Sequence, residues 1–499
     1  MKITLESPVN KYYVQTLGMI FFPGEHFGSK QNGESCENEP KLYVRSEERD
    51  GGVYSFAAAE YKDKRSEADY FAKQTDGRTE ERTLKLSVGG AVLAALGDLM
   101  GYRPAWGMMI GVRPSKVASE MLNAGISKTR VKKILNSDYL VIPKKAALAT
   151  DIALTEKRII GEGSPRDCSV YISIPFCPSR CTYCSFVSYT SKRLLDLIPE
   201  YLVSLKEDIR ANFETIDRLG LRVRTVYIGG GTPTILSEEQ IRDLLSYIAS
   251  LTDVSQLDEY TMEAGRPDTI TEEKLAIARE YGVTRVSVNP QSLSDDVLYG
   301  IGRHHTAEDF FRAFSDARRA KIKTVNVDLI AGLPGDNFKR FSSTMDKVLQ
   351  LSPENITVHT FCVKKSAEIL RLNSDVYSVR GGDAGKCVDY SQIKTQQAGY
   401  IPYYMYRQKN TVGNYENVGF SLQGHEGLYN IYMMEEIHSI FAAGAGAVTK
   451  LVDNTGSHLE KRTIERLFHQ KYPYEYLAED RSRQFSDTAE AFYREHGMI

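Results

Sequence analysis

The chain has 499 residues, of which 42% are hydrophobic, and a formal net charge of −2. This length allows a large buried core and roughly three domains, and the composition is typical of a folded globular protein rather than a disordered or fibrous one. The near-neutral charge gives no electrostatic basis for binding nucleic acid.

The protein is expected to be neither exported nor inserted into a membrane. The first residues, MKITLESPVNKYY, lack the apolar core of a secretory signal. The apolar stretch 86–97 is too short to cross a bilayer, so we expect a buried helix there. Seven cysteines, three of them clustered, do not suggest a disulfide framework. We therefore expect a cytoplasmic protein without a membrane span.

Residues 1–160 predict an accessory α/β domain, because strand-like and helix-like patterns are mixed there. We expect the charged stretch 60–85 to be a solvated helix or loop. Pro114 is suited to the first position of a helix, and a long helix is expected to lead from this domain into the next.

From residue 168 onward, apolar strand-like runs alternate with helix-like segments. The six runs are 169–175, 224–230, 259–265, 284–289, 323–330 and 354–361. Ser237 and Thr271 precede acidic first turns and are predicted helix N-caps. The alternation predicts parallel strands, in either an open doubly wound sheet or a full or partial (β/α) barrel. In both architectures ligands bind at the carboxyl ends of the strands.

The stretch IPFCPSRCTYCSF, 174–186, places Cys177, Cys181 and Cys184 on one loop directly after a strand. Thiolates at this spacing suit zinc or an iron–sulfur cluster. A structural zinc site needs a fourth ligand, and the nearest histidine in the sequence is His304. Three ligands fit a [4Fe–4S] cluster that keeps one iron open. Zinc and three unrelated buried cysteines are the alternatives.

The cysteine stretch resembles the cluster loop of the radical S-adenosylmethionine (SAM) superfamily. Within it, the chain is similar to the oxygen-independent coproporphyrinogen III oxidase (coproporphyrinogen dehydrogenase) family through YIGGGTPT, YTMEAGRPD, RVSVNPQSL, GIGRHHTAEDFFRAF and NVDLIAGLPGD. The resemblance implies an α/β fold with a partial (β/α)6 barrel over 161–450, after the accessory domain 1–160 and before a helical C-terminal tail, 451–499. It also implies a [4Fe–4S] cluster and one or two SAM molecules, from which one electron releases a 5′-deoxyadenosyl radical.

The resemblance further implies roles for residues at the strand ends. Gly230 would meet the amino group of SAM, and Gly231 and Thr232 would line a neighbouring pocket. Without a ligand, the same glycine run forms a tight turn. Glu263 would accept hydrogen bonds from the ribose hydroxyls or from a cationic amine, and the alternative is a solvated strand end.

Three more polar residues of the quoted motifs are expected to bind SAM. Arg303 would pair with the SAM carboxylate, whereas Gln291 and Asp328 would hydrogen-bond adenosine or a second SAM. The alternative for Asp328 is a loop cap. A last group is expected to contact adenine or the cluster, with the tyrosines otherwise belonging to the core: Tyr171, Tyr183 and Val448.

The substrate that the family implies, coproporphyrinogen III, carries four propionates, so its pocket needs cations and apolar walls. The implied reaction converts two propionates to vinyl groups and gives protoporphyrinogen IX. Candidate cations, each otherwise solvated surface, are Arg113, Lys116, Arg266, Lys364, Lys365, Arg407 and Lys409. From Arg113 we expect the N-terminal domain to close the barrel mouth against water. A reductant such as flavodoxin or ferredoxin is the expected protein partner.

The chain departs from the family at Phe186, where the best-understood members carry a fourth cysteine. Relatives with an aromatic residue there include haem-trafficking proteins without decarboxylase activity. Those proteins end in a His-Asn motif followed by Tyr-Trp, whereas the only tryptophan here is Trp106. Two alternatives therefore stay open: a haem-binding and trafficking protein, or a radical SAM enzyme that methylates haem or opens its ring.

Overall fold

The computed structural model describes residues 1–23, 39–161, 164–184, 186, 188–362, 382–408, 411–456 and 462–499. The chain forms two compact units. The first holds 1–154, 373–385 and 405–416, and the second holds 155–372, 386–404 and 417–499.

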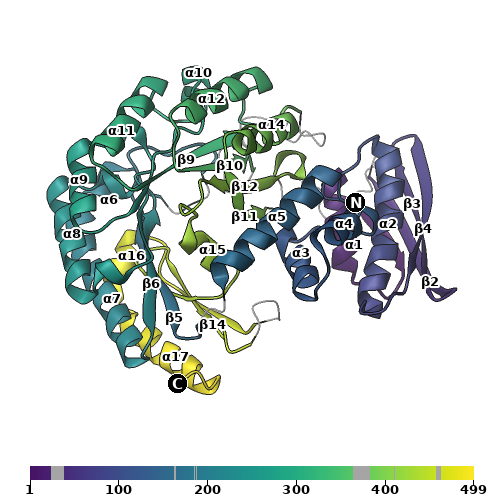
Figure 1. The fold of residues 1–499 in the computed structure, drawn as a ribbon, viewed down its shortest axis with the longest axis horizontal. Coiled ribbons are helices and arrows are strands. Elements are labelled where there is room, and N and C mark those ends of the chain that lie inside the picture. The colour runs from purple at the N-terminus through teal and green to yellow at the C-terminus, as the bar shows by residue number, and fades with distance from the viewer. Residues whose placement is uncertain are drawn as a thin grey trace. The chain divides into compact units, whose positions relative to one another are not determined.

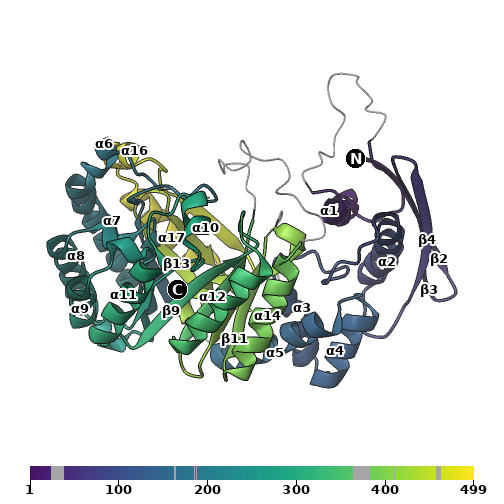
Figure 2. The ribbon, with the colours of Figure 1, turned by 90° about the horizontal axis from the view of Figure 1, so that it is seen from above.

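The first unit is built on a four-stranded sheet in the order β1-β2-β3-β4. The strands are β1 (Lys2–Glu6), β2 (Lys41–Arg49), β3 (Gly52–Tyr61) and β4 (Lys64–Lys73). β1 is parallel to β2, and the other two pairs are antiparallel. Helix α2 (Glu80–Met100) lies against β3 and β4 (Figure 2). Further helices are α1 (Lys11–Phe21), α3 (Pro114–Asn123), α4 (Lys128–Ser137) and the beginning of α5 (Pro143–Ile160).

The prediction of a solvated helix or loop over 60–85 is wrong, because β4 lies in this stretch and α2 begins at Glu80. The residues of β4 alternate between a half-buried and an exposed face, which is the two-residue period of a strand. On the half-buried face, the ring of Tyr70 lies directly over Gly90 of α2. The number of charged residues hid the period, and most of them occupy the other face: Arg65, Glu67, Asp69 and Lys73.

Helix α2 confirms the buried helix predicted over 86–97. It is the one helix among the described residues that is long and apolar enough to cross a membrane, but 72% of that apolar window is buried inside the protein. Such burial against a sheet is what a core helix shows. Helix α3 begins at Pro114, as predicted.

The second unit contains six parallel strands that neighbour one another in chain order, as predicted (Figure 1). They are β5 (Asp167–Ile174), β6 (Arg222–Gly230), β7 (Glu259–Met262), β8 (Arg285–Ser287), β9 (Thr324–Ala331) and β10 (Asn355–Thr360). The helices on their outer side are α7 (Ile198–Arg218), α8 (Glu238–Leu251), α9 (Glu272–Glu280), α11 (Ala307–Arg319) and α12 (Phe338–Gln350). This is the expected partial (β/α)6 barrel, and all six carboxyl ends lie on one edge.

Local signals explain where these helices begin. Ser237 and Gln240 form a capping box at the start of α8, and the side chain of Thr271 accepts a hydrogen bond from the N–H of Lys274 in α9. Both residues therefore act as the predicted N-caps.

The sheet extends beyond the barrel strands on both sides, which the sequence patterns did not predict. Next to β5 lie β13 (Ser439–Ala443, parallel), β14 (Val448–Val452) and β15 (Ile464–Phe468). Beyond β10 lie β12 (Glu416–Ser421) and β11 (Ile401–Arg407). The remaining helices include α14 (Ala384–Gln397), α15 (Leu428–Met434), α16 (Pro473–Ala478) and α17 (Ser482–Glu495).

Candidate functional site

The loop that follows β5 is fixed by backbone hydrogen bonds at its ends and in its middle. Phe176 and Tyr189 form an isolated parallel bridge, and the N–H of Cys177 donates to the carbonyl of Tyr189 at 3.0 Å. In the middle, the N–H of Thr182 donates to the carbonyl of Ile301 at 3.0 Å. The cysteines therefore lie on a defined arc at the carboxyl edge of the barrel.

The three cysteines share this arc and are largely shielded from solvent. Cys177 and Cys181 are each 9% exposed, and Cys184 is half-buried. Sγ of Cys177 lies 3.3 Å from Oγ1 of Thr232. Burial raises the pKa of Cys177 to about 11, against the opposite effect of the Thr232 hydroxyl, so metal binding there has to displace a proton. No three His, Cys, Asp or Glu side chains within the described ranges form a ready-made cage for a metal ion.

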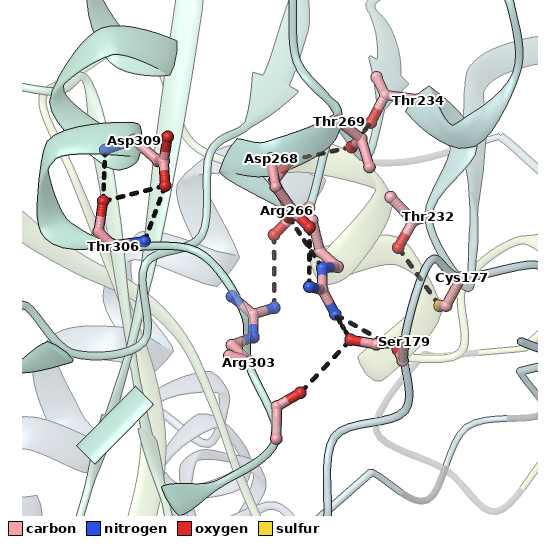
Figure 3. A network of polar contacts seen from close by, with 12 residues as sticks. Cys177, Ser179, Thr232, Thr234, Arg266, Asp268, Thr269, Arg303, Thr306 and Asp309 are labelled. Atoms are coloured by element: carbon pink, nitrogen blue, oxygen red, sulfur yellow. Dashed lines mark hydrogen bonds and ion pairs between the residues drawn. The ribbon is translucent and has the colours of Figure 1, made fainter. Parts of the chain in front are cut away.

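A buried ion pair anchors the cysteine loop to the end of β7 (Figure 3). Arg266 is 3% exposed, and its Nη1 donates to Oγ of Ser179 at 2.7 Å. Its Nη2 lies 2.9 Å from Oδ2 of Asp268, and its Nε lies 3.0 Å from Oδ1. This two-pronged pair fixes the guanidinium, which in turn fixes the loop between the first two cysteines.

A second buried arginine, Arg303, borders the loop. It is 6% exposed, and its Nη1 donates to the carbonyl of Asn289. Burial by itself disfavours the charged form, but the neighbouring Tyr183 and Cys181 raise the pKa of Arg303. Its Nε has no hydrogen-bond partner in the part of the chain that the structure describes. The site thus holds a permanent positive charge with a donor left over for a ligand.

The glycine run at the end of β6 lies against the cysteine loop. Gly230 has a φ of +107°, and a Cβ there would lie 3.0 Å from Oγ of Ser173. A Cβ on Gly231 would lie only 2.5 Å from the carbonyl oxygen of Phe176. The N–H of Thr232 donates to that same carbonyl at 2.8 Å. The close approach of the protein's own backbone therefore already requires glycine at 231, as the tight-turn alternative supposed.

Glu263 follows β7 and lies beside three tyrosine rings. Oε1 of Glu263 accepts a hydrogen bond from the phenol of Tyr227. The rings of Tyr227 and Tyr429 stack with centroids 4.5 Å apart, and Tyr171 stacks on them at 6.1 and 6.2 Å. Burial raises the pKa of Glu263 to about 7, although the Tyr227 phenol opposes this. The carboxyl group is thus ready to change charge near neutral pH.

Gln291 and Asp328 lie together at the ends of β8 and β9. The N–H of Gln291 donates to the carbonyl of Asp328 at 3.1 Å. Gln291 has a φ of +67° and is 8% exposed, and its Oε1 has no hydrogen-bond partner among the described residues. Asp328 accepts from Nδ2 of Asn326 at 2.7 Å, and Nε2 of His359 lies 3.8 Å from its Oδ2. Burial tends to raise the pKa of Asp328, but the opposite effect of His359 and Asn326 is larger. The net pKa is therefore below its usual value, and the Asp328 carboxylate stays ionised.

The structure thus brings most of the predicted site residues to one edge of the barrel. Tyr183 borders Cys181, Cys184 and Arg303. Val448 is the first residue of β14 and follows a short loop after β13, the neighbour of β5.

Two of the seven candidate substrate cations are buried and already paired inside the protein. Arg266 holds the cysteine loop, as described above. Arg407 is 4% exposed in the first unit, where it donates to the carbonyl of Met109 and lies 5.6 Å from the ring of Trp106. Their burial contradicts the solvated-surface alternative for both residues. Nε of Arg407 has no hydrogen-bond partner among the described residues, and propionate binding by either side chain stays a prediction. Three others fall outside the described residues: Lys364, Lys365 and Lys409.

Two residues of this site were missed by the sequence analysis, Tyr227 and Tyr429. Tyr227 lies inside the motif YIGGGTPT, where its strand position predicts a side chain on the same face as Gly229. Tyr429 comes from α15, more than 160 residues later in the chain, and no local pattern predicts that it joins Tyr227.

The donor set fits an iron–sulfur cluster together with a small zwitterionic nucleoside. Three cysteines on one loop supply soft ligands. The unpartnered Nε of Arg303 and Oε1 of Gln291, both buried, are a donor and an acceptor without a protein partner among the described residues. Buried polar atoms in this state are costly unless a ligand completes them.

Comparison with known proteins agrees with this chemistry. Residues 171–348 match the Radical SAM superfamily. The chain is 34% identical over 441 residues to the oxygen-independent coproporphyrinogen-III oxidase-like protein HemZ of Bacillus subtilis, covering 87% of each chain. It is 31% identical over 310 residues to the heme chaperone HemW of the same organism, covering 61% of this chain and 77% of that one.

Among solved structures, the coproporphyrinogen III oxidase HemN of Escherichia coli is similar, with a TM-score of 0.49 and 19% identity over 67% of this chain and 73% of that one. Radical SAM proteins bind a [4Fe–4S] cluster and SAM, and these are the cofactors of this chain. The chain therefore belongs to the radical SAM superfamily and, within it, to the family of oxygen-independent coproporphyrinogen III oxidase-like proteins.

Proposed function

We propose that this protein decarboxylates two propionate side chains of coproporphyrinogen III without oxygen, leaving vinyl groups and giving protoporphyrinogen IX. The observation that carries the proposal is the similarity to the oxidase-like protein HemZ, which extends over 87% of both chains and so includes far more than the cofactor site. The tetrapyrrole class of the substrate comes from that relative.

When bound, the cluster and SAM would supply a 5′-deoxyadenosyl radical as the acceptor of a hydrogen atom from the β-carbon of a propionate. To leave a vinyl group, the propionate would then have to lose carbon dioxide and pass one electron to an external one-electron acceptor. The protein residues have three tasks. Cys177, Cys181 and Cys184 hold the cluster and leave one iron open. Arg303 holds the SAM carboxylate, and Glu263 accepts from the ribose.

Holding the cluster is the first task. The second task is to orient the nucleoside, and for this we propose, besides Arg303 and Glu263, a further set of residues at the strand ends. These residues are Tyr171, Tyr183, Gly230, Gly231, Thr232, Gln291, Asp328 and Val448. The third task is the exclusion of water, because a carbon radical reacts with almost any neighbouring group. Burial of Gln291 and Arg303, each under 10% exposed, supports such a dry site.

The proposal is tested by anaerobic turnover of the reconstituted protein with SAM, a reductant and coproporphyrinogen III. We expect 5′-deoxyadenosine, two carbon dioxide molecules per porphyrinogen, and a product mass lower by two carbon dioxide molecules and four hydrogen atoms. Cys181→Ala should lose its cluster and all activity. Cys168→Ala is the matched control, because Cys168 is buried within β5 and outside the loop. Cleavage of SAM without any decarboxylated product would reject the substrate and keep the cofactor chemistry.

A second candidate function is haem binding and trafficking, which the similarity to the heme chaperone HemW favours. Phe186, where the better-understood oxidases carry a cysteine, points the same way and is 69% exposed. The same incubation, run once with coproporphyrinogen III and once with haem, separates the two functions, because a chaperone would leave the porphyrinogen unchanged and would bind haem tightly without changing its mass. A gain of methyl mass would instead indicate a haem methyltransferase.

A further inference from the structure

A second buried polar cluster lies next to the cysteine loop and involves residues 462–499, here called the C-terminal segment, in which no site residue was predicted. Its centre is Asp208 of α7, which is 6% exposed. Oδ2 of Asp208 accepts from the N–H of Gly444 at 2.9 Å and from the phenol of Tyr476 at 2.8 Å. Nε2 of His469 lies 3.4 Å from the same oxygen. One carboxylate oxygen therefore joins α7, the loop after β13 and the C-terminal segment.

Tyr201, two helical turns before Asp208 on the same face of α7, makes a second bridge. Its hydroxyl donates to the carbonyl of Ser173 at 2.8 Å and accepts from the N–H of Ala445 at 2.9 Å. Oγ of Ser173 donates in turn to the carbonyl of Ala445 at 3.0 Å. The ring of Tyr201 packs edge-on against Phe176, the residue before the first cysteine of the loop, with centroids 5.1 Å apart.

These contacts fix the loop of residues 444–448, which ends at Val448. Gly444 has a φ of +100°, and a Cβ there would lie 2.6 Å from the Tyr201 hydroxyl and 2.7 Å from the carbonyl oxygen of Ser173. The N–H of Gly446 donates to the carbonyl of Gln470 at 2.8 Å. The 444–448 loop is therefore held from α7 on one side and from the C-terminal segment on the other.

Packing alone does not account for this cluster. Burial raises the pKa of Asp208, although His469, Gly444 and Tyr476 oppose the rise. A buried carboxylate costs stability, and an apolar side chain of similar size could fill the same space between α7 and the sheet. Unlike an apolar side chain, the carboxylate accepts a hydrogen bond from a backbone N–H of the 444–448 loop. This directional contact fixes the position of the loop.

We propose that Asp208 and Tyr201 are positioning residues that hold the 444–448 loop against the end of β5, so that Val448 meets the adenine of SAM bound at the cysteine loop. The C-terminal segment, through Tyr476 and His469, then belongs to the support of the SAM site. This inference rests on the part that the proposed function gives Val448 in orienting the nucleoside, but it does not depend on the tetrapyrrole.

The test uses the full chain with its cluster reconstituted anaerobically. Tyr201→Phe removes one hydroxyl and keeps the ring on Phe176. We expect the dissociation constant for SAM to rise about fivefold, which corresponds to the free energy of one lost hydrogen bond. Asp208→Ala should weaken SAM binding about tenfold or more. Binding of 5′-deoxyadenosine should weaken by the same factors, while iron per chain stays at the wild-type level.

Thr215→Val is the matched control. Thr215 is a buried residue of α7 whose hydroxyl lies 2.7 Å from Oγ of Ser486 in α17, so this variant loses a contact between α7 and the C-terminal segment without touching the 444–448 loop. Wild-type affinity for SAM in Tyr201→Phe, or an equal loss in Thr215→Val, overturns the proposal. A fall in iron content that parallels the loss of SAM affinity overturns the proposal as well, because it would mean that these residues stabilise the cysteine loop as a whole. If Asp208→Ala does not fold, Tyr201→Phe decides.

Failure here is distinguishable from failure of the proposed function, because SAM and 5′-deoxyadenosine binding are measured without porphyrinogen. A protein that binds SAM through this loop but releases no carbon dioxide keeps the positioning role and loses the proposed substrate.

Discussion

The phenol of Tyr227 donates a hydrogen bond to Oε1 of Glu263, the carboxyl group that follows β7. The stacked rings of Tyr171 and Tyr429 lie beside this pair. A half-buried acid among aromatic rings has lost water that would stabilise its charge, and one phenol replaces only part of it. The balance of these two effects determines the pKa of about 7 for Glu263.

The first prediction concerns stability and pH. Because burial raises the pKa of Glu263 from 4.5 to about 7, the folded SAM-free protein prefers the protonated acid. The raised pKa stabilises the folded state relative to an ionised Glu263. This stabilisation is fully present below pH 4.5 and is lost as the pH rises to 7. Glu263→Gln stays neutral, so we expect its free energy of unfolding to exceed that of the wild type by roughly 1–3 kcal/mol at pH 8 and to equal it near pH 4.5.

Chemical denaturation of both proteins across this pH range measures the difference. Glu239→Gln, an exposed change in the first turn of α8, is the control and should show no such pH dependence. An equal difference between wild type and Glu263→Gln at both pH values would contradict the assignment of the titration to Glu263.

The second prediction separates the phenol from its ring. Tyr227→Phe removes the hydrogen bond that lowers the pKa of Glu263, so that pKa should rise by roughly half a unit to one unit. If the ionised carboxylate accepts from the ribose, SAM affinity grows as the pH passes 7 in the wild type. In Tyr227→Phe the same growth should come at a higher pH. Tyr429→Phe, which changes the same stack without a hydrogen bond to Glu263, should keep the wild-type midpoint in equilibrium dialysis of SAM against pH.

The strands of the barrel and the cysteine loop could be predicted from the sequence because their signals are local. Val170 and Ile172 of β5 belong to an apolar run that ends where the loop begins, and the spacing of Cys177, Cys181 and Cys184 lies within eight positions. Strand β13 could not be assigned to the edge of β5 in this way. Its partner lies about 270 residues earlier in the chain, and pairing over such a separation leaves no periodic trace in either segment.

The sequence of α7 carries a local signal for the buried cluster around Asp208. Tyr201, Leu205, Asp208 and Asn212 occur at helical spacing on α7, and all four are buried. A charged residue within an apolar stripe of a helix predicts a buried partner, because an unpaired carboxylate there is too costly. The partners themselves, Gly444 and Tyr476, are identified only by the tertiary structure.

The third prediction concerns the anchor of the cysteine loop. Arg266→Lys keeps the charge but cannot hold both oxygens of Asp268 and the hydroxyl of Ser179 in one plane. We expect the variant to lose roughly 1–3 kcal/mol of stability and to retain less iron after anaerobic reconstitution than the wild type. Iron analysis and thermal unfolding measure both effects. Arg242→Lys is the control, since Arg242 pairs with Glu280 on the exposed surface and its loss costs little. Equal iron content in the two variants would show that Arg266 does not position the loop.

The fourth prediction concerns the contact between the glycine run and the cysteine loop. In Gly231→Ala, the new Cβ would lie 2.5 Å from the carbonyl oxygen of Phe176, so either the end of β6 or the residue before Cys177 has to move. Overpacking of this kind costs about 1–3 kcal/mol, and the displacement should weaken SAM binding by more than the loss of stability alone explains. Gly300→Ala is the control, because a Cβ there meets nothing within 4 Å and the residue lies in a helix. Calorimetric unfolding and SAM binding of the two variants test this, and an unchanged SAM affinity in Gly231→Ala would mean that the glycine run serves only the turn.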